Sequence, residues 1–410
     1  MGACRFCNKE LTTSFADLGM SPVSNAFIRE DKRNAMERFY PLHAYVCDGC
    51  HLVQLEQFES PEQIFNEEYA YFSSYSDSWL AHAKAYCDQM EKLLGLGPKS
   101  QVIEIASNDG YLLQYFVQKG IPVLGVEPAA NVARAAEQKG VPSLVKFFGV
   151  QTARELAVSG MKADLLLGNN VLAHVPNIND FVGGMKVALA PHGVITMEFP
   201  HLLELMRHNQ FDTIYHEHFS YLSLHTTRQI FAAHGLRLFD VEQLTTHGGS
   251  LRIYACHEDD AARPVTQRLE KLAAEEGAAG LESSQTYGRF AEQVRETKRK
   301  LLAFLIQAKR DGRTIVGYGA PAKGNTLLNY CGVRTDFIDY TVDRSPAKQG
   351  TYLPGVHIPV YAPDKIFETK PDYVLILPWN LREEVMSQMA GISAWGGKFV
   401  VPIPEARVYG

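Results

Sequence analysis

Val102-Ile-Glu-Ile-Ala-Ser-Asn-Asp-Gly110, followed by Tyr111-Leu-Leu-Gln-Tyr-Phe-Val117, decides the fold of the middle of the chain. A short apolar run, a polar turn ending in glycine and a longer mixed segment predict a strand, a tight turn and a helix. The same alternation continues, with strands predicted at 122–126, 164–168 and 193–197 and helices at 131–139 and 180–189. This order predicts an α/β fold with a doubly wound parallel sheet that is covered on both faces.

The end of the second predicted strand indicates which ligand such a sheet would hold. Glu127 directly follows that strand and lies 17 residues after Gly110, which suits an acid that accepts hydrogen bonds from ribose hydroxyls. The first turn contains neither G-x-G-x-x-G nor G-x-x-x-x-G-K-[ST], the glycine patterns that admit a pyrophosphate to a helix N-terminus. The residues therefore favour S-adenosylmethionine (SAM), which has adenosine but no phosphate. A dinucleotide stays as the alternative.

Four of the seven cysteines form two Cys-x-x-Cys pairs, Cys4 with Cys7 and Cys47 with Cys50. The two-residue gap lets each pair aim both thiolates at one tetrahedral zinc ion, about 2.3 Å away. A redox-active Cys-x-x-Cys of the thioredoxin type is the alternative. Two such pairs near one terminus favour a Cys₄ zinc site, whose closed coordination shell stabilises a fold and leaves no open position for catalysis.

A second strand-and-turn pattern begins at Thr314-Ile-Val-Gly-Tyr-Gly319. Before it, a long helix is predicted with one apolar face, formed by Tyr287, Phe290, Val294, Leu301 and Leu305. After it, further strands are predicted at 336–342, 373–377 and 398–401. The chain therefore contains a second α/β unit with its own core.

The turn of this second unit contains Gly317, Gly319, Lys323 and Gly324, a set that suits a phosphate group. Asp343 follows the next strand and suits a ribose site. The glycine spacing is not that of G-x-G-x-x-G. A nicotinamide-dependent oxidoreductase is therefore an alternative function that the spacing disfavours, and a non-catalytic zinc-anchored binding protein is another.

The richest cluster of ionisable side chains is Tyr215-His-Glu-His218. Two histidines this close suit metal ligation, but H-E-x-x-H, the helical pattern of zinc proteases, is absent from the sequence. A polar surface loop is the plainest alternative. A histidine, whose ordinary pKa lies near neutrality, is also suited to remove a proton from a substrate.

Composition and charge exclude several functional classes. The chain has 40 Lys and Arg against 46 Asp and Glu, a net charge of −6, and no basic block, so nucleic-acid binding is not expected. No apolar run approaches the roughly 20 residues that cross a bilayer, so no membrane span is expected. The first residues also lack the pattern of a secretory signal. We therefore expect a cytoplasmic protein with reduced or metal-bound cysteines.

Several motifs together resemble those of the nucleotide-sugar C-methyltransferases of deoxysugar pathways. The matching stretches are Glu104-Ile-Ala-Ser-Asn-Asp-Gly110, Asn169-Asn-Val-Leu-Ala-His174, Ile214-Tyr-His-Glu-His-Phe219, His247-Gly-Gly-Ser-Leu-Arg252 and Gly317-Tyr-Gly-Ala-Pro-Ala-Lys-Gly324. The resemblance implies a zinc-binding module at 1–66, a SAM-binding methyltransferase domain at 67–255 and a Rossmann-like nucleotide-sugar-binding domain at 256–410. Ala106 departs from the pattern, because SAM enzymes usually have a glycine there.

The resemblance implies SAM-dependent methylation of carbon 3 in a nucleotide-linked 4-keto-6-deoxysugar. Removal of the proton beside the ketone gives an enolate, whose carbon takes the methyl group. His218 is then the base, Tyr215 and Glu217 are its partners, and His174 and Tyr69 also lie at the reacting sugar. O-methylation of a nucleotide sugar stays open as an alternative, and a monomer is expected.

The resemblance also implies two sets of ligand-binding residues. The residues expected at SAM are Glu104, Ala106, Asn108, Asp109, Gly110, Glu127, Pro128, Asn169 and Asn170. The residues expected at the nucleotide sugar are Tyr71, Ser73, Ser74, His247, Gly248, Arg252, Tyr318, Ala322, Lys323, Asn325 and Asp343. SAM and a structural zinc ion are thus the expected cofactors, and the nucleotide sugar is the expected partner.

Overall fold

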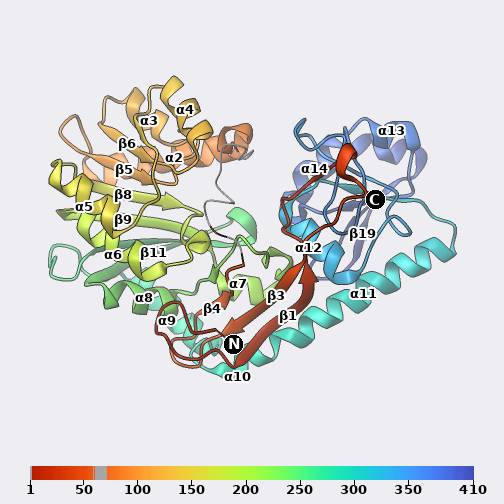
Figure 1. The fold of residues 1–410 in the computed structure, drawn as a ribbon, viewed down its shortest axis with the longest axis horizontal. Coiled ribbons are helices and arrows are strands. Elements are labelled where there is room, and N and C mark those ends of the chain that lie inside the picture. The colour runs from red at the N-terminus through yellow and green to blue at the C-terminus, as the bar shows by residue number, and fades with distance from the viewer. Residues whose placement is uncertain (1, 59, 61–71) are drawn as a thin grey trace.

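The computed structural model describes residues 2–58, 60 and 72–410. They form two lobes that are joined along one side by an N-terminal hairpin and a long helix (Figure 1). The N-terminus lies beside the hairpin and the C-terminus lies in the second lobe. Each lobe is built around a largely parallel sheet, which confirms the α/β fold that the sequence predicts.

The hairpin belongs to an antiparallel sheet with the strand order β1–β3–β4–β10. Its strands are β1 Thr13–Ser21, β3 Tyr40–Val46, β4 Val53–Leu55 and β10 Ser220–Tyr221. Between β1 and β3, the strand β2 (Ile28–Arg29) precedes the short helix η1 (Glu30–Lys32) and pairs with β15 (Thr351–Tyr352) of the second lobe. A strand from the middle of the chain, β10, therefore completes the N-terminal sheet.

The central lobe contains a seven-stranded sheet in the order β11–β12–β9–β8–β5–β6–β7. The strands are β5 Val102–Ile105, β6 Val123–Val126, β7 Ser143–Leu144, β8 Ala163–Asn169, β9 Leu189–Pro200, β11 Leu236–Leu244 and β12 Ser250–His257. Five neighbouring strands of this sheet, in the order β9–β8–β5–β6–β7, are parallel to one another, as predicted. In contrast, β12 runs antiparallel to both β9 and β11. The short connection η5 (Thr246–Gly248) is the reason, because it can join only strands of opposite direction.

Helices cover both faces of this sheet, because successive side chains of each strand point to opposite sides. In β8, Leu165 and Leu167 pack in the core formed with α2 and α3, whereas Leu166 packs in the core formed with α5, α6 and α8. The helices and short helical turns are η2 Ser73–Tyr75, α2 Asp77–Leu94, α3 Leu113–Gln118, α4 Ala130–Gln138, α5 Val150–Val158, η3 Leu172–His174, α6 Ile178–Ala188, α7 Leu202–Arg207, η4 Phe211–Thr213, α8 Leu224–Ala233 and α9 Gln267–Ala278.

The second lobe contains a six-stranded sheet in the order β16–β14–β13–β17–β18–β19, of which only β19 is antiparallel to its neighbour. Its elements are β13 Ile315–Tyr318, α12 Ala322–Cys331, β14 Thr341–Val342, β16 Val360–Tyr361, α13 Lys365–Thr369, β17 Tyr373–Ile376, η6 Trp379–Leu381, α14 Arg382–Gln388, η7 Ala390–Trp395, β18 Lys398–Val401 and β19 Arg407–Tyr409. The prediction of a strand over 336–342 is wrong for 336–340, because β14 begins only at Thr341. There the backbone N–H groups of Phe337 and Ile338 donate to the Arg334 carbonyl and close a turn.

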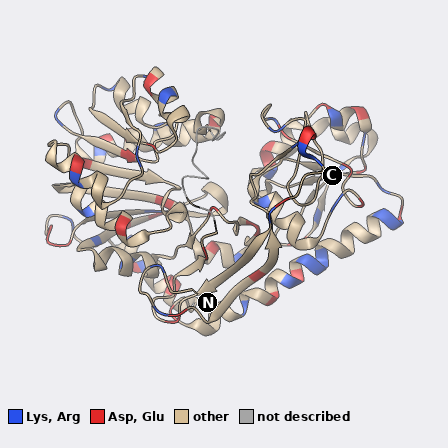
Figure 2. Ribbon diagram, viewed as in Figure 1, with Lys and Arg blue, Asp and Glu red and all other residues tan. Residues whose placement is uncertain are grey.

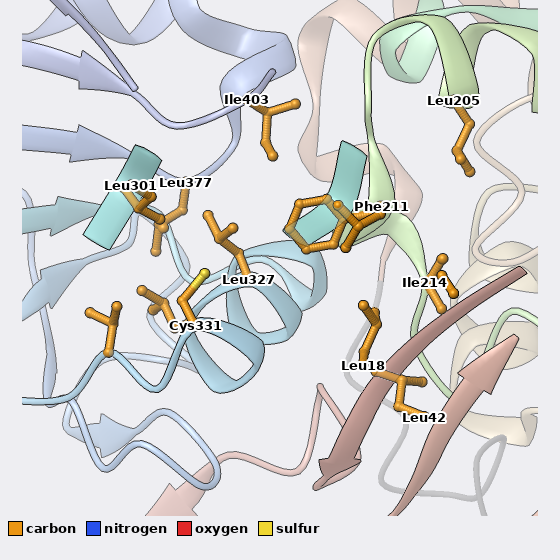
Figure 3. Close-up of a cluster of buried hydrophobic side chains, with 14 of the residues drawn as sticks. Leu18, Leu42, Leu205, Phe211, Ile214, Leu301, Leu327, Cys331, Leu377 and Ile403 are labelled. Carbon is orange, nitrogen blue, oxygen red and sulfur yellow. The ribbon is translucent and has the colours of Figure 1, made fainter. Parts of the chain in front are cut away.

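One hydrophobic core connects the hairpin to both lobes (Figure 3). Leu18 and Leu42 of the hairpin meet Phe211 of the central lobe, and Leu327 and Leu377 enter from the second lobe. The lobes are therefore held together by apolar packing.

Two helices, α10 (Ser284–Gly288) and α11 (Phe290–Arg310), close this core from outside. Phe290, Val294, Leu301 and Leu305 form the predicted buried face of α11, and Lys and Arg residues recur along the same helix (Figure 2). None of the helices among the described residues combines the length and apolar character of a membrane span.

Candidate active site

The turn after β5 contains three residues with a left-handed backbone: Ala106 (φ 56°), Asn108 (φ 49°) and Gly110 (φ 72°). This conformation costs a residue with a Cβ roughly 1–2 kcal/mol, so a glycine is the unstrained choice at position 106. Glu127 holds the turn in place. Its two carboxylate oxygens accept the backbone N–H of Asn108 at 3.0 Å and that of Ala129 at 2.8 Å. Each oxygen keeps a second lone pair for a ligand.

Buried amide atoms without partners among the described residues lie along the same edge of the sheet, in Asn169 and Asn170. Neither polar atom of the Asn169 side chain has a hydrogen-bond partner among the described residues, and Oδ1 of Asn170 also has none there. Asn169 ends β8 and Asn170 directly follows it, and β8 is the neighbour of β5 in the sheet. An unpaired buried polar group costs about 1–3 kcal/mol, so these amides fit a polar ligand. SAM offers matching donors and acceptors in its ribose, base and amino-acid groups.

Acidic side chains complete this edge. Glu104 is fully buried, and its pKa is raised well above the ordinary value by burial and by the nearby Glu127 and Asp109 carboxylates, against a hydrogen bond from Tyr111. Asp109 accepts from Lys139 at 2.9 Å. Burial thus favours the neutral form of Glu104, which can donate a hydrogen bond, whereas the charge of Asp109 is paired.

The four cysteines of the N-terminal module lie together. Their sulfur atoms are within 4.8 Å of one another, with Cys4 3.6 Å from Cys50 and Cys7 3.4 Å from Cys47. Four thiolates around one zinc ion stand about 3.8 Å apart, so the cluster fits that ion. Gln54 Nε2 also donates to the Cys4 sulfur at 3.2 Å, as expected for a residue that supports a metal ligand.

His218 and Tyr215 form a hydrogen-bonded pair. Nδ1 of His218 is 2.9 Å from the Thr213 carbonyl, which can only accept, so Nδ1 holds the ring proton. Nε2 is therefore unprotonated and accepts the Tyr215 hydroxyl at 2.7 Å. Burial, and next the repulsion between the His174 and His218 rings when both are protonated, lower the pKa of His218 well below its ordinary value. At neutral pH the imidazole is thus a proton acceptor with a fixed tautomer.

His174 stands edge-on to His218, with 4.7 Å between the ring centres. It is in η3, shortly after Asn169, which ends β8, and Asn170. Burial lowers the pKa of His174 to about 4, although a hydrogen bond to the Glu217 backbone opposes this. The carboxylate of Glu217 accepts from Asn25 Nδ2 at 2.8 Å, so this side chain reaches toward the N-terminal module.

A second polar group lies where the lobes meet. Lys323, in the first turn of α12, contacts the Asn380 amide oxygen and lies 4.5 Å from the centre of the Trp379 ring. Trp379 donates to Asp212 at 2.7 Å, which links the second lobe to η4 of the central lobe. Burial lowers the pKa of Lys323 to about 8 and raises that of Asp212 to about 6, each opposed by the charge of the other.

A cleft of about 510 Å³ adjoins this group and has walls from both lobes. His208, Gln210 and Gly248 form one side, and Trp379 lies on the other. The second-lobe side lies just beyond the carboxyl ends of β17 and β18, where parallel sheets bind ligands. Gly248 is required at this point, because its φ is 89° and a Cβ would lie 2.7 Å from the Trp379 ring.

His247 connects the cleft region to the cofactor edge. Its Nε2 atom is 3.0 Å from the Asn170 amide nitrogen, and its ring stands 5.3 Å from the Trp79 ring. The His247 imidazole is exposed and thus lies at the surface between the expected SAM site and the Lys323 group.

Comparison with known proteins agrees with this arrangement. Models of three families match the chain: a zinc binding domain at 4–65, a methyltransferase domain at 78–241 and a C-methyltransferase C-terminal domain at 245–404. The C-methyltransferase NovU of Streptomyces niveus is 36% identical over 410 residues, which cover 99% of this chain and 96% of the relative. The chain belongs to the SAM-dependent C-methyltransferases. The expectations of a methyltransferase with SAM and zinc as cofactors are therefore confirmed, and the oxidoreductase and binding-protein alternatives are wrong.

Two further similarities cover smaller parts of this C-methyltransferase. The ubiquinone biosynthesis O-methyltransferase of Bartonella bacilliformis is 26% identical over 96 residues, which cover 23% of this chain and 39% of that protein. Among solved structures, magnesium protoporphyrin IX methyltransferase from Synechocystis PCC 6803 with bound SAH has 14% identity and a TM-score of 0.35, covering 43% of this chain and 83% of that one.

Some residues predicted at the nucleotide sugar are engaged elsewhere in the C-methyltransferase. Arg252 is buried in β12, where its guanidinium donates to Glu198 at 2.7 Å and to Glu242 at 2.8 Å. The backbone N–H of Ser73 and the hydroxyl of Ser74 bind the side chains of the turn after β5. These contacts place Arg252 in the sheet and the two serines against the cofactor turn.

The predicted residues of the second lobe are spread over α12 and the neighbouring strand ends. Asn325 donates to the Ser24 carbonyl at 2.7 Å and so joins α12 to the N-terminal module. Asp343 accepts the Ala320 N–H at 2.7 Å and closes the turn after β13. Tyr318 ends β13 and donates to Gln388, and Ala322 begins α12. Of the predicted set here, Lys323 lies beside Trp379, which bonds to Asp212 of the central lobe. Tyr69 and Tyr71 lie outside the described residues.

Sequence reasoning missed Asp212, Trp379 and Asn380. Trp379 and Asn380 follow the predicted strand 373–377, so the rule that ligands lie at the carboxyl ends of strands was sufficient to find them. Asp212 has no such signal, since it contacts the tryptophan only through the tertiary fold.

Proposed function

We propose that this C-methyltransferase methylates carbon 3 of a nucleotide-linked 4-keto-6-deoxysugar. The Tyr215–His218 pair is the observation that carries the proposal, because its unprotonated Nε2 and fixed tautomer suit removal of a proton from carbon. SAM, when bound, supplies an electrophilic methyl group. A carbon becomes a nucleophile for that group only after it loses a proton, and a neighbouring ketone makes that loss feasible.

The proton has a defined path in this proposal. The C–H proton moves to the Tyr215 oxygen while the Tyr215 hydroxyl proton moves to Nε2 of His218. The C–H electron pair becomes the enolate, and the Thr213 carbonyl holds the imidazolium by accepting from Nδ1. The hydroxyl that relays the proton can then donate to the enolate oxygen, where negative charge develops.

Two nearby groups act on the charges that this step creates. Lys323 is a half-buried cation; its charge lowers the pKa of His218, which disfavours the imidazolium, and it would stabilise a negative enolate close by. The neutral ring of His174 packs against His218 and limits the approach of water. The base is consequently available at pH 7, when a solution histidine would be partly protonated.

The cleft between the lobes supports a nucleotide-linked substrate. It has about 510 Å³ of space, an indole in its wall and the Lys323 ammonium beside that indole. An ammonium suits a diphosphate, and an indole suits a base or a sugar ring. The sugar would then lie between this cleft and the SAM edge, near His247.

The test is product analysis with a matched pair of substrates. The enzyme and SAM are incubated with a set of nucleotide-linked 4-keto-6-deoxysugars that have dTDP, GDP or CDP, and each product is weighed by mass spectrometry. The control is the same sugar with the ketone reduced to a hydroxyl. We expect one added methyl group with a 4-keto sugar and none with its 4-hydroxy control. Methylation of both would contradict the enolate.

A further inference from the structure

One side chain of the zinc-binding module contacts the protein segments on either side of the proton-transfer pair. Arg5 donates from one guanidinium nitrogen to the Pro176 carbonyl at 2.6 Å and from the other to the Leu55 carbonyl. Its guanidinium carbon also lies 5.3 Å from the centre of the Phe219 ring. Pro176 is two residues after His174, and Phe219 directly follows His218. Arg5 therefore joins the two segments that position these histidines.

The backbone reinforces the same connection. Leu55 N–H donates to the Phe219 carbonyl at 3.1 Å, and Phe219 N–H donates to the Ala173 carbonyl at 2.8 Å. Next to these bonds, the strands β4 and β10 pair with each other, with Gln54 opposite Ser220. A continuous hydrogen-bonded ladder thus runs from the N-terminal sheet through the residue after His218 to the residue before His174.

The metal ligands hold the start of this ladder. Gln54, in β4, donates from its side chain to the Cys4 sulfur at 3.2 Å and accepts the Arg5 backbone N–H at 2.9 Å. Arg5 itself lies in the first Cys-x-x-Cys knuckle, between Cys4 and Cys7. An ion that closes the knuckle therefore fixes the backbone from which Arg5 extends.

We propose that Arg5 is a positioning residue for the Tyr215–His218 pair, through which the zinc-binding module sets the rate of proton transfer. The inference rests on the proposed role of His218 as the base. Arginine suits this position, because its planar fork can donate to two carbonyls at once. A misplacement of reacting groups by about 1 Å can cost 10²-fold in rate, so a clamp on both flanking segments affects turnover.

The test compares variants of the full-length, zinc-loaded enzyme. Arg5→Ala removes both side-chain hydrogen bonds, and Arg5→Lys keeps the charge and a single donor nitrogen. Lys9→Ala is the matched control, because Lys9 is exposed and lies two residues after the same knuckle. Zinc content, SAM affinity, kcat and KM are measured for each. Spectra of ¹⁵N-histidine-labelled protein, with the His218 signal assigned from His218→Asn, report whether Nδ1 still holds the ring proton.

We expect Arg5→Ala to keep its zinc and its SAM affinity while kcat falls roughly 10- to 100-fold. The His218 signal should lose its single tautomer, Arg5→Lys should be intermediate, and Lys9→Ala should match the wild type. If Arg5→Ala does not fold, Arg5→Lys decides the question by the same readouts. Unchanged kcat with an unchanged His218 signal would overturn the inference, as would loss of zinc from Arg5→Lys. An altered His218 signal with normal kcat would uphold the positioning role and refute His218 as the base.

Discussion

Replacing His218 by asparagine removes the proton acceptor and leaves most of its surroundings in place. General base catalysis contributes about 10²–10⁴-fold, so kcat should fall by that factor, or by about 3–5 kcal/mol in activation free energy. The structural cost is smaller, because the Asn amide nitrogen takes the place of Nδ1 and can still donate to Thr213, so that the main loss is one hydrogen bond from Tyr215, worth about 0.5–1.5 kcal/mol. The turn that holds SAM is formed by other residues, so SAM affinity should not change.

The assay is steady-state turnover of His218→Asn at saturating SAM, with calorimetric SAM binding and thermal unfolding as checks on the fold. His192→Asn is the matched control, since His192 is exposed in β9. The pH profile gives a second reading. The pKa of His218 is lowered in the folded enzyme, so kcat should stay level as pH falls through 6.5 and should decline only at lower pH. Full turnover by His218→Asn, or an acidic limb at or above pH 6.5, would refute the reasoning.

Three further outcomes are expected. Glu127→Gln should weaken SAM binding by about 1.5–3 kcal/mol in calorimetry, because one backbone N–H of the turn then faces an amide NH₂. The control Glu137→Gln, on the exposed face of α4, should leave SAM binding unchanged. Equal SAM affinity of the two variants would show that the end of β6 does not hold the cofactor. Cys47→Ser should lose the zinc ion and unfold at a lower temperature, as measured by metal analysis and calorimetry, and a metal-free variant of unchanged stability would contradict a structural site. NADPH should not bind at micromolar concentration, since the turn after β13 lacks the dinucleotide spacing, and a fluorescence titration that shows binding would contradict this.

Local patterns predict the parts of the fold that depend on residues close in sequence. The strand, turn and helix around Gly110 follow from apolar spacing, and the pairing of Tyr215 with His218 needs only a three-residue separation. The two Cys-x-x-Cys knuckles are also local, and one ion brings them together. Short-range spacing is therefore sufficient to indicate the cofactor edge, the zinc ligands and the candidate base.

Contacts between distant segments could not be predicted in this way. The bond from Trp379 to Asp212 joins residues of different lobes, and that from Arg5 to Pro176 joins the first knuckle to a loop after β8. Neither has a periodicity or a spacing that marks it. The ion pairs of buried Arg252 with Glu198 and Glu242 could not be predicted either. A strand pattern shows that the backbone of a residue is in a sheet, but it does not show which acidic side chains lie next to that residue.

Carbon–carbon bond formation at carbon 3 is the central claim, and isotope-coupled NMR tests it most directly. The enzyme is given SAM with a ¹³C-labelled methyl group and a nucleotide-linked 4-keto-6-deoxysugar labelled with ¹³C at carbon 3. The account predicts a one-bond carbon–carbon coupling between the new methyl group and carbon 3 of the product. A methyl signal without that coupling, at the shift of a methyl group on oxygen, would contradict it.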